Sequence, residues 1–296
     1  MNRIPSWIRL SRKTSDHFSD VHGFVKHGGL HTVCESAKCP NRHECWNRGT
    51  ATLMLLGDVC TRACSFCAIK AGRPDGLDPN EPRRAAAAVR QMDLNYVVLT
   101  SVTRDDLPDG GAGVFAETIR LIREALPEIA VEVLTPDFEG RTADIDTVLE
   151  ARPDVFNHNL ETVARLQSVI RPQAAYGRSL AVLKHAVQWE PDVVVKSGIM
   201  LGLGEEDDEV RQAMQDLRSV GVALLTLGQY LQPTRNHPPV QRYVPPDDFD
   251  AWTREAEAMG FKGVASGPLV RSSYRADELL QSALDGRTTQ RRTAAS

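Results

Sequence analysis

The chain has 296 residues, of which 42% are hydrophobic and 25% are charged, and its formal net charge at pH 7 is −4. This composition is that of an ordinary globular protein, and the slightly acidic balance does not indicate a nucleic-acid-binding surface. Residues 1–20 lack the apolar core of a secretory signal, and no stretch is apolar for long enough to cross a membrane. We therefore expect a cytoplasmic protein that binds neither nucleic acid nor membrane.

The cysteines come first along the chain and are unevenly distributed. All of them lie near the amino end, at Cys34, Cys39, Cys45, Cys60, Cys64 and Cys67. Three disulfides would suit a small secreted chain, and this chain is neither small nor preceded by a signal. Clustered thiols in a reducing compartment favour metal ligands instead.

Apolar runs rich in β-branched residues predict six strands after residue 50. These runs cover residues 52–58, 95–102, 129–135, 154–159, 192–201 and 223–231. They do not alternate strictly between apolar and polar residues, which is typical of strands buried on both faces.

Helical periodicity fills the gaps between the runs, as at residues 115–126, 180–187, 210–217 and 249–259. Alternating strands and helices predict a parallel sheet with right-handed crossovers. Six such units can form an open doubly wound sheet or a partial barrel. In both folds the loops after the carboxyl ends of the strands hold the chemistry. Residues 286–296 are polar, and we expect them to be frayed.

The spacing of the cysteines bears on the kind of metal. Cys60, Cys64 and Cys67 form C-x-x-x-C-x-x-C in CTRACSFC, just after the first predicted strand, and the earlier three are spaced C-x₄-C-x₅-C. A closed zinc site needs four ligands, often from two C-x-x-C pairs, and neither spacing suits it. Three thiolates on an iron–sulfur cluster leave one iron open. The spacing therefore favours two iron–sulfur clusters over zinc.

Several motifs carry a resemblance to known families. CTRACSFC, with the aromatic Phe66 before its last cysteine, resembles the radical S-adenosylmethionine superfamily. The earlier group, in LHTVCESAKCPN and continuing to Cys45, is similar to the lipoyl synthase family. So are TSVTRDDLPDGGA (100–112), FNHNLETV (156–163), KSGIMLGLGE (196–205), LTLGQYLQPT (225–234) and GPLVRSSYRADE (267–278). The resemblance covers residues 30–280.

The resemblance implies a partial (β/α)₆ barrel of the TIM type over residues 51–265. Residues 1–50 would form an amino-terminal extension that carries the ligands of an auxiliary cluster. Residues 266–296 would form a short carboxyl-terminal segment with the RSSY motif and the frayed tail.

The resemblance also assigns the cluster ligands. Cys60, Cys64 and Cys67 would hold a 4Fe–4S cluster that binds S-adenosylmethionine at its open iron. The other three cysteines, Cys34, Cys39 and Cys45, would hold an auxiliary 4Fe–4S cluster whose fourth ligand is Ser273. From the residues alone, Ser272 and Ser273 can equally be read as a helix cap before Ala276.

Phe66 is implied as a contact of S-adenosylmethionine, and so are four residues that follow two of the strands. Gly110 and Gly111 would line its methionine end, although a tight turn explains them equally well. Asn159 and Glu161 would bond the ribose hydroxyls, and their alternative is capping and first-turn charge of a helix.

Two cations remain as candidates for the cofactor carboxylate. Arg178 and Lys196 could each bind it, or each could belong to a structural ion pair. We expect His158 to be a structural histidine.

The implied activity is the insertion of two sulfur atoms, at C6 and C8, into an octanoyl group on a lysine of a lipoyl carrier domain. Such an enzyme, a sulfurtransferase, uses two molecules of S-adenosylmethionine and consumes its auxiliary cluster. Its expected partners are carrier domains of 2-oxoacid dehydrogenase acyltransferase subunits and of the glycine cleavage system. A low-potential donor such as ferredoxin or flavodoxin would supply electrons, and an iron–sulfur carrier protein would restore the cluster.

Two alternatives stay open at this point. The first is another radical enzyme with two clusters, although every cysteine precedes residue 68 and little of the chain follows residue 270. The second is an iron–sulfur or zinc protein that stores, senses or passes electrons without catalysis.

Overall fold

A computed structural model describes residues 4–8, 19, 22, 23, 25, 29–37, 39–47, 50–92, 94, 96–189 and 193–294. Of residues 286–294 it describes the backbone. Two of the expected strands begin at residues 95 and 192, which lie outside the described residues, as does most of the expected extension before residue 29.

One sheet of eight strands forms the centre of the molecule. Its strands are β1 (His31–Thr32), β2 (Thr52–Leu55), β5 (Tyr96–Ser101), β6 (Ala130–Leu134), β7 (Val155–Asn157), β8 (Val194–Leu201), β9 (Leu224–Gln229) and β10 (Gly263–Gly267). They neighbour one another in chain order, with β1 antiparallel to β2 and every later pair parallel. A doubly wound sheet would reverse its order midway, so the partial barrel of the TIM type is confirmed.

Two details differ from the expected strands. β10 adds a seventh parallel strand, which its small residues, GVASG, did not predict. Within the described ranges no pairing joins β1 to β10, so the barrel stays open there. A further pair, β3 (Val59–Cys60) and β4 (Lys70–Ala71), brackets the CTRACSFC motif.

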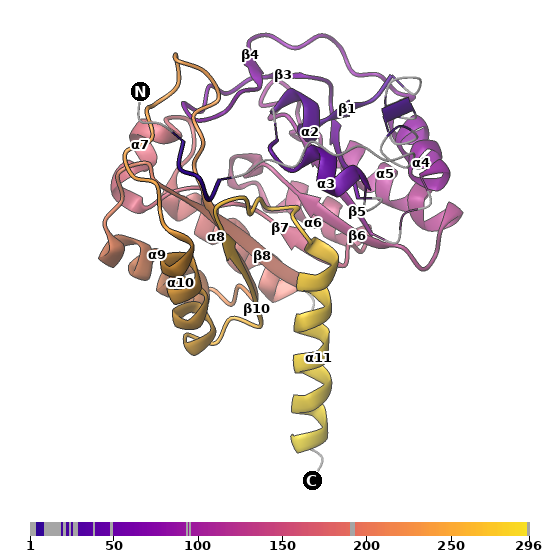
Figure 1. Cartoon of the computed structure of the whole chain (residues 1–296). Helices are drawn as coiled ribbons and strands as arrows, with labels where there is room; N and C mark the ends of the chain where they lie inside the picture. Colours follow the sequence, from indigo (N-terminus) through magenta and orange to yellow (C-terminus); the bar gives the residue numbers. More distant parts are fainter. Residues whose placement is uncertain are drawn as a thin grey trace.

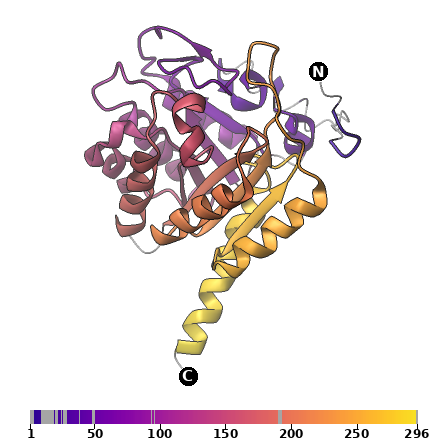
Figure 2. The same cartoon turned by 90° about the vertical axis from the view of Figure 1, so that its left-hand side faces the viewer.

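Helices cover the outer side of the sheet (Figures 1 and 2). They are α4 (Glu81–Gln91), α5 (Ala112–Ala125), α6 (Thr142–Glu150), α8 (Tyr176–Trp189), α9 (Asp207–Ser219) and α10 (Pro246–Ala258). Shorter turns are α2 (Val33–Ser36), α3 (Arg42–Asn47), η1 (Phe138–Gly140), η2 (Ala164–Leu166) and α7 (Gln167–Ile170). The apolar stripes face the core as expected: Phe115, Ile119 and Ile122 of α5 are fully buried. None of the described helices combines the length and the apolar character that crossing a membrane requires.

The last helix, α11 (Ala276–Ala294), packs against the interior of the barrel. Its residues Leu279 and Leu280 join a cluster with Tyr96, Val155 and other residues at the amino ends of the strands. In both views the rest of α11 extends away from the barrel (Figures 1 and 2). The backbone is helical through Ala294, where we had expected a frayed end.

A buried polar layer lies in the middle of the barrel. The ammonium of Lys196 donates to both carboxylate oxygens of Glu132, at 2.9 and 3.0 Å, and both side chains are fully buried. The same carboxylate accepts from the Tyr96 hydroxyl at 2.6 Å and the Asn157 amide at 2.8 Å. The charges of the ion pair are therefore balanced within the interior.

Candidate active site

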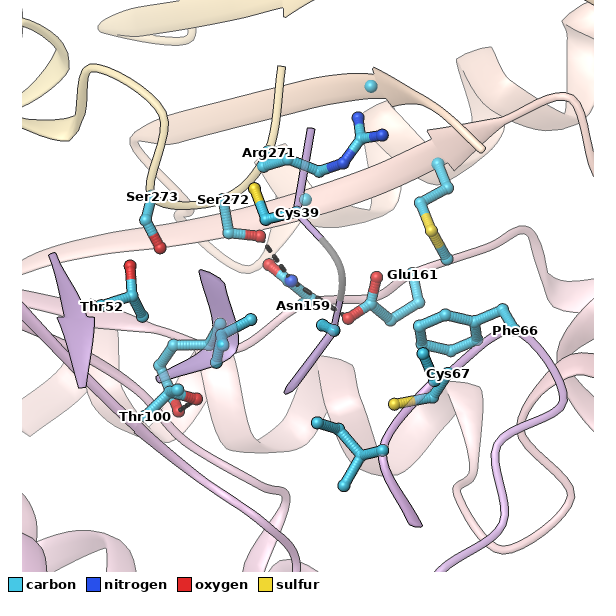
Figure 3. A pocket seen from close by; sticks show the side chains of 18 of the residues that line it. Cys39, Thr52, Phe66, Cys67, Thr100, Asn159, Glu161, Arg271, Ser272 and Ser273 are labelled. Carbon is cyan, nitrogen blue, oxygen red and sulfur yellow. Dashed lines mark hydrogen bonds between the residues drawn. The ribbon is translucent and has the colours of Figure 1, made fainter. Parts of the chain in front are cut away.

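A cavity of about 520 Å³ opens at the carboxyl ends of the strands. It is lined by the six cysteines, Cys34, Cys39, Cys45, Cys60, Cys64 and Cys67. Figure 3 shows Cys39 with Ser272 and Ser273 on one side of this space, and Cys67 on another. Both groups of cysteines therefore lie at the end of the barrel where chemistry is expected.

The loop of residues 56–70, here called the cluster loop, starts with an unusual turn. Leu56 and Gly57 both have positive φ, 70° and 85°, directly after β2. The Leu56 N–H donates, at 2.8 Å, to the carboxylate of Glu81, which is the first residue of α4. This buried hydrogen bond holds a backbone conformation that a leucine rarely adopts.

Arg62 fastens the middle of the cluster loop to the barrel. Its guanidinium donates to both oxygens of Asp105, at 2.7 and 2.8 Å, and lies 2.8 Å from a carboxylate oxygen of Asp137. Burial alone would raise the pKa of Asp137, but the hydrogen bond and charge of Arg62 outweigh it and hold that pKa well below its usual range. The carboxylate is therefore ionised, and the pair is fully formed at neutral pH.

Backbone bonds fix the rest of the cluster loop. The Thr61 N–H donates to the Thr103 carbonyl at 3.0 Å, and the Ser65 N–H donates to the Ile170 carbonyl at 2.9 Å. The sulfur of Cys60 accepts from the N–H groups of Arg62 and Thr103, at 3.4 and 3.3 Å. Hydrogen bonds to a cysteine sulfur stabilise a thiolate and tune the potential of a cluster that it holds.

The thiols of this group share a low-polarity setting. Burial raises the pKa of Cys67 to about 12, and the neighbouring Cys64 and Cys60 add to the rise. Burial also raises the pKa of Cys64, although the nearby Arg171 opposes it. Buried thiols with raised pKa are inert as nucleophiles, and they lose their protons when they bind metal.

The second group lies on residues 31–47, here called the auxiliary segment. Cys34 belongs to α2, whose cap Thr32 accepts from the Glu35 N–H at 3.3 Å, and Cys45 belongs to α3. Burial raises the pKa of Cys34 to about 11. These thiols, like the first three, form no disulfide.

The auxiliary segment is joined to the opposite end of the chain. The Asn41 amide donates to the Leu269 carbonyl at 2.5 Å, across 228 positions. The Tyr274 hydroxyl donates to Glu44 at 2.9 Å, and Arg275 lies 3.4 Å from the same carboxylate. These bonds bring the RSSY motif to the cysteines.

Ser273 lies on the wall of the cavity rather than on a helix end. α11 begins at Ala276, so its N-cap position is Arg275 and neither serine occupies it. In Figure 3 the hydroxyls of Ser273 and Thr52 point toward one another. The neighbouring Ser272 accepts from the Asn159 amide at 2.6 Å. The cap interpretation of the two serines is therefore not supported.

Asn159 and Glu161 also line the cavity, between the two groups of cysteines. The Asn159 amide donates to Glu161 at 3.0 Å, while its buried Oδ1 has no hydrogen-bond partner among the described residues. No helix starts at these residues, since the next turn is η2. An unpaired buried acceptor on a cavity wall fits a ligand hydroxyl, so the structure favours binding over capping.

Arg171 is a cavity residue that the sequence did not reveal. Its Nη1 donates to the carbonyls of Asn159 and Leu160, at 3.1 and 3.3 Å, while its buried Nε has no partner among the described atoms. A buried, unpaired N–H of a guanidinium fits an anionic ligand group. Arg171 follows the short helix α7, which the apolar pattern did not predict. It does not lie at the carboxyl end of a predicted strand, so nothing in the pattern placed it at the cavity.

Four expected contacts of the cofactor lie elsewhere. The described residues that line the cavity do not include Gly110, Gly111, Arg178 or Lys196. Gly111 precedes α5, and a side chain on it would collide with Leu56, 2.2 Å away. Arg178 lies 3.2 Å from Asp137, and Lys196 is bound to Glu132 in the layer below. The positions of the two glycines support a tight turn, and those of Arg178 and Lys196 support structural ion pairs.

Two other expectations can be compared with the structure. Phe66 lines the cavity and packs in a small apolar cluster with Tyr230 and Ile170. His158 is buried, with Nδ1 2.9 Å from the Thr135 carbonyl and Nε2 2.9 Å from the Ser179 hydroxyl. Burial lowers its pKa to about 4, so it is a neutral structural histidine, as expected.

The arrangement of the thiols bears on the metal group. In the part of the chain that the structure describes, no three His, Cys, Asp or Glu side chains are close enough to share one metal ion. The cysteines instead surround a common space in two groups of three. A four-iron cluster spreads its ligands over several irons, so thiols on the walls of such a space fit a cluster.

Comparisons with known proteins agree with this geometry. The radical SAM superfamily matches residues 54–217. Lipoyl synthase from Rubrobacter xylanophilus is 54% identical over 95% of this chain and 88% of its own length. Lipoyl synthase from Thermus thermophilus is 54% identical over 93% and 86%, and the one from Geobacillus thermodenitrificans is 50% identical over 96% of each chain.

Solved structures share the fold at low identity. The FeFe-hydrogenase maturase HydG from Carboxydothermus hydrogenoformans matches 90% of this chain and 68% of its own, with a TM-score of 0.60 and 14% identity. Coproporphyrinogen III oxidase from Escherichia coli, a radical SAM enzyme, matches 73% and 55%, with a TM-score of 0.53 and 11% identity. At these identities the likeness concerns the fold alone.

Proposed function

Because this chain belongs to the lipoyl synthase family within the radical SAM superfamily, we propose that it inserts two sulfur atoms, at C6 and C8, into a protein-bound octanoyl group. The observation that carries this proposal is the pair of cysteine groups that face one cavity together with Ser273. The family's cofactors are S-adenosylmethionine and two 4Fe–4S clusters. When bound, they supply a 5′-deoxyadenosyl radical, which can take hydrogen from an unactivated carbon, and the sulfur to be inserted.

The cluster loop would hold the first cluster. Cys60, Cys64 and Cys67 supply three thiolates and leave one iron for the cofactor. Arg62 and the backbone bonds of the loop keep these ligands in place. Phe66 lines the cavity beside Cys67 and would help to exclude water from the cluster.

The cavity wall would bind the rest of S-adenosylmethionine. The free Oδ1 of Asn159 and the carboxylate of Glu161 suit the ribose hydroxyls, which donate hydrogen bonds. Arg171, rather than Arg178 or Lys196, has the free N–H that suits the cofactor carboxylate. Gly110 and Gly111 would act indirectly, by the packing of Gly111 against Leu56 at the start of the cluster loop.

The auxiliary segment would hold the second cluster through Cys34, Cys39 and Cys45, with Ser273 as the fourth ligand. A serine oxygen is a hard ligand beside soft sulfurs, so this contact is the weakest of the four. Ser273 would therefore be the ligand that such a cluster loses most easily. Residues 1–50, 51–265 and 266–296 then act as the extension, the barrel and the segment that closes the auxiliary site.

The substrate would be an octanoyl group on a lysine of a lipoyl carrier domain. Acyltransferase subunits of 2-oxoacid dehydrogenases and the glycine cleavage carrier protein supply such domains. We propose ferredoxin or flavodoxin as the electron donor and an iron–sulfur carrier protein as the source of a new auxiliary cluster.

A mass spectrum tests the function. The full-length chain is reconstituted with iron and sulfide without oxygen, reduced, and mixed with S-adenosylmethionine and an octanoyl-lysine peptide. We expect the peptide to gain two sulfur atoms while 5′-deoxyadenosine forms. If 5′-deoxyadenosine forms and the peptide stays unchanged, the substrate is wrong. If neither forms in a protein that contains iron, the proposed catalysis is wrong.

A further inference from the structure

The loop after β9, residues 230–244, reaches back to the cluster loop through one histidine. The Nε2 atom of His237 lies 3.0 Å from the backbone carbonyl of Cys67, across 170 positions. Cys67 is one of the proposed ligands of the first cluster. The contact therefore joins two cavity walls that are far apart in the sequence.

Its chemistry defines the state of the imidazole. A carbonyl oxygen can only accept a hydrogen bond, so Nε2 must carry the proton. The other ring nitrogen, Nδ1, lies 2.8 Å from the Thr234 hydroxyl, which can donate to it. A ring with its proton on Nε2 satisfies both partners at once.

The loop that presents His237 is held by its own side chains. The Tyr230 hydroxyl donates to the Pro238 carbonyl at 2.9 Å, and the Gln232 amide donates to the His237 carbonyl at 2.7 Å. Gln229 bridges the base of the loop, donating to the Arg242 carbonyl at 3.0 Å and accepting from the Val244 N–H at 2.8 Å. These bonds join the two sides of the loop, and His237 joins the loop to the cluster loop.

The same loop is part of the cavity. Gln232 and Pro233 line it, beside the cluster loop's own Phe66 and Cys67. Val240 and Phe66 pack onto one small apolar cluster that is centred on Tyr230. If the loop separated from Cys67, this wall of the cavity would open to water.

We propose that His237 is a positioning residue, which fastens the loop of residues 230–244 to the cluster loop and keeps the cavity closed during the reaction. This inference rests on the proposed function, because a closed cavity matters most when a radical must meet the octanoyl chain before it meets anything else. His237 need not touch the cofactor, since it acts through the backbone of Cys67.

The test uses three variants of the full-length, cluster-loaded chain. His237→Ala removes the donor, while His237→Gln keeps an N–H at a similar distance from the backbone. His185→Ala is the matched control, because His185 lies on the outer helix α8 and bonds Asp146 of α6, away from the cavity. Two quantities are measured: hydrogen exchange of peptides over residues 60–72 and 230–244, and 5′-deoxyadenosine formed per sulfur inserted.

We expect His237→Ala to raise the hydrogen-exchange rate of both peptides by about fivefold, because that factor corresponds to the net stabilisation of one hydrogen bond. The amount of 5′-deoxyadenosine formed per sulfur inserted should rise by a similar factor. His237→Gln should restore most of both, and His185→Ala should change neither. If His237→Ala shows the same hydrogen exchange and the same amount of 5′-deoxyadenosine per sulfur as the wild-type chain, the inference is wrong. If the wild-type chain inserts no sulfur, the proposed function fails, while the exchange measurement still decides whether His237 holds the two loops together.

Discussion

The two groups of cysteines face the same cavity but are held by different parts of the molecule. The cluster loop is bound to the barrel: Glu81 holds its first turn, and Asp105 and Asp137 hold Arg62. The auxiliary segment pairs with the barrel only at its start, through β1 and β2, and its later residues are bound to the far end of the chain, through the Asn41–Leu269 and Glu44–Tyr274 contacts.

This difference matches two different demands. A site that cleaves S-adenosylmethionine needs its open iron at a fixed place, and buried ion pairs to the barrel provide that. A cluster that is consumed must be replaced after each reaction. Separating the two chain ends would expose the auxiliary site while the parallel strands stay paired. We therefore expect changes in the two regions to have separable effects.

The largest effect is expected from Cys64→Ala. This change removes one of three thiolates of the first cluster, and the remaining two cannot hold it in a form that binds the cofactor. Formation of 5′-deoxyadenosine should fall to the level of a protein-free control, measured by liquid chromatography. Undiminished cleavage would show that the cluster loop does not hold the catalytic cluster.

Cys39→Ala should separate the two steps. The auxiliary cluster is lost, but the cluster loop does not depend on this residue, so the chain should still cleave S-adenosylmethionine when no substrate is present. Sulfur insertion should stop. Normal lipoyl yield from this variant would contradict the division of work between the two groups.

Ser273→Ala should have a narrower effect. The cysteine ligands of both clusters remain, and only the proposed oxygen ligand is removed. We expect the first cluster to keep its electron paramagnetic resonance signal, while product falls strongly. Ser219→Ala is the matched control, since the Ser219 hydroxyl donates to the Asp216 carbonyl at the end of α9, away from the cavity. Normal product from Ser273→Ala would show that the serine is not a ligand.

Arg62→Ala tests how the cluster loop is held. It leaves Asp137 buried without its nearest cation, and breaking a buried ion pair costs about 3–5 kcal/mol. The free energy of unfolding of the metal-free chain, measured with urea, should fall by that amount. Arg165→Ala, which breaks an exposed pair with Glu209, should change it little.

The loss of unfolding free energy in Arg62→Ala should depend on pH, because it involves the ionised carboxylate of Asp137. Its pKa in the folded chain is below the unfolded value of about 3.9, so its stabilising effect is present above that pH and is lost as the pH falls further. In Arg62→Ala, the pKa of Asp137 rises because it loses the hydrogen bond and charge of Arg62, while Arg178 and the Glu139 N–H remain beside the carboxylate. The difference between the two proteins should therefore shrink below about pH 4. A constant difference would show that Asp137 is not the partner that matters.

The smallest effect is expected from Tyr274→Phe. It removes one hydrogen bond, to Glu44, between the two chain ends, worth about 1 kcal/mol. Alkylation of Cys39 and Cys45 in the metal-free chain should become a few times faster. Tyr176→Phe, which removes a similar bond to Asp216 outside the cavity, should leave the rate unchanged.

The sequence predicted six of the strands and the cysteine groups because both depend on local patterns, whereas the choice of a partial barrel over a doubly wound sheet came from the family resemblance. Apolar runs define strands, and thiol spacing defines ligand groups, wherever the chain later folds. β10 was missed because GVASG is short and weakly apolar. The strand pattern also does not show how far from the cavity a residue lies along the barrel. Lys196 and Gly198 point to the same side of β8, but Lys196 lies two residues further from the cavity and meets Glu132 instead.

Contacts between distant loops could not be predicted either. Arg171 and His237 come from segments without a strand or helix pattern, and their partners lie in other loops. The choice between binding and capping at Asn159 and Ser273 depends on where the helices begin, which the sequence sets only loosely. Such positions need three-dimensional information.

Isotope labelling tests the central claim most directly. The chain is loaded with clusters made from ³⁴S sulfide, freed of excess sulfide, and given S-adenosylmethionine, reductant and the octanoyl-lysine peptide. If the cluster on the auxiliary segment is the sulfur source, both inserted atoms should carry ³⁴S, and the yield should stop at one lipoyl group per chain. Unlabelled sulfur in the product, or continued turnover without a new cluster, would contradict the account.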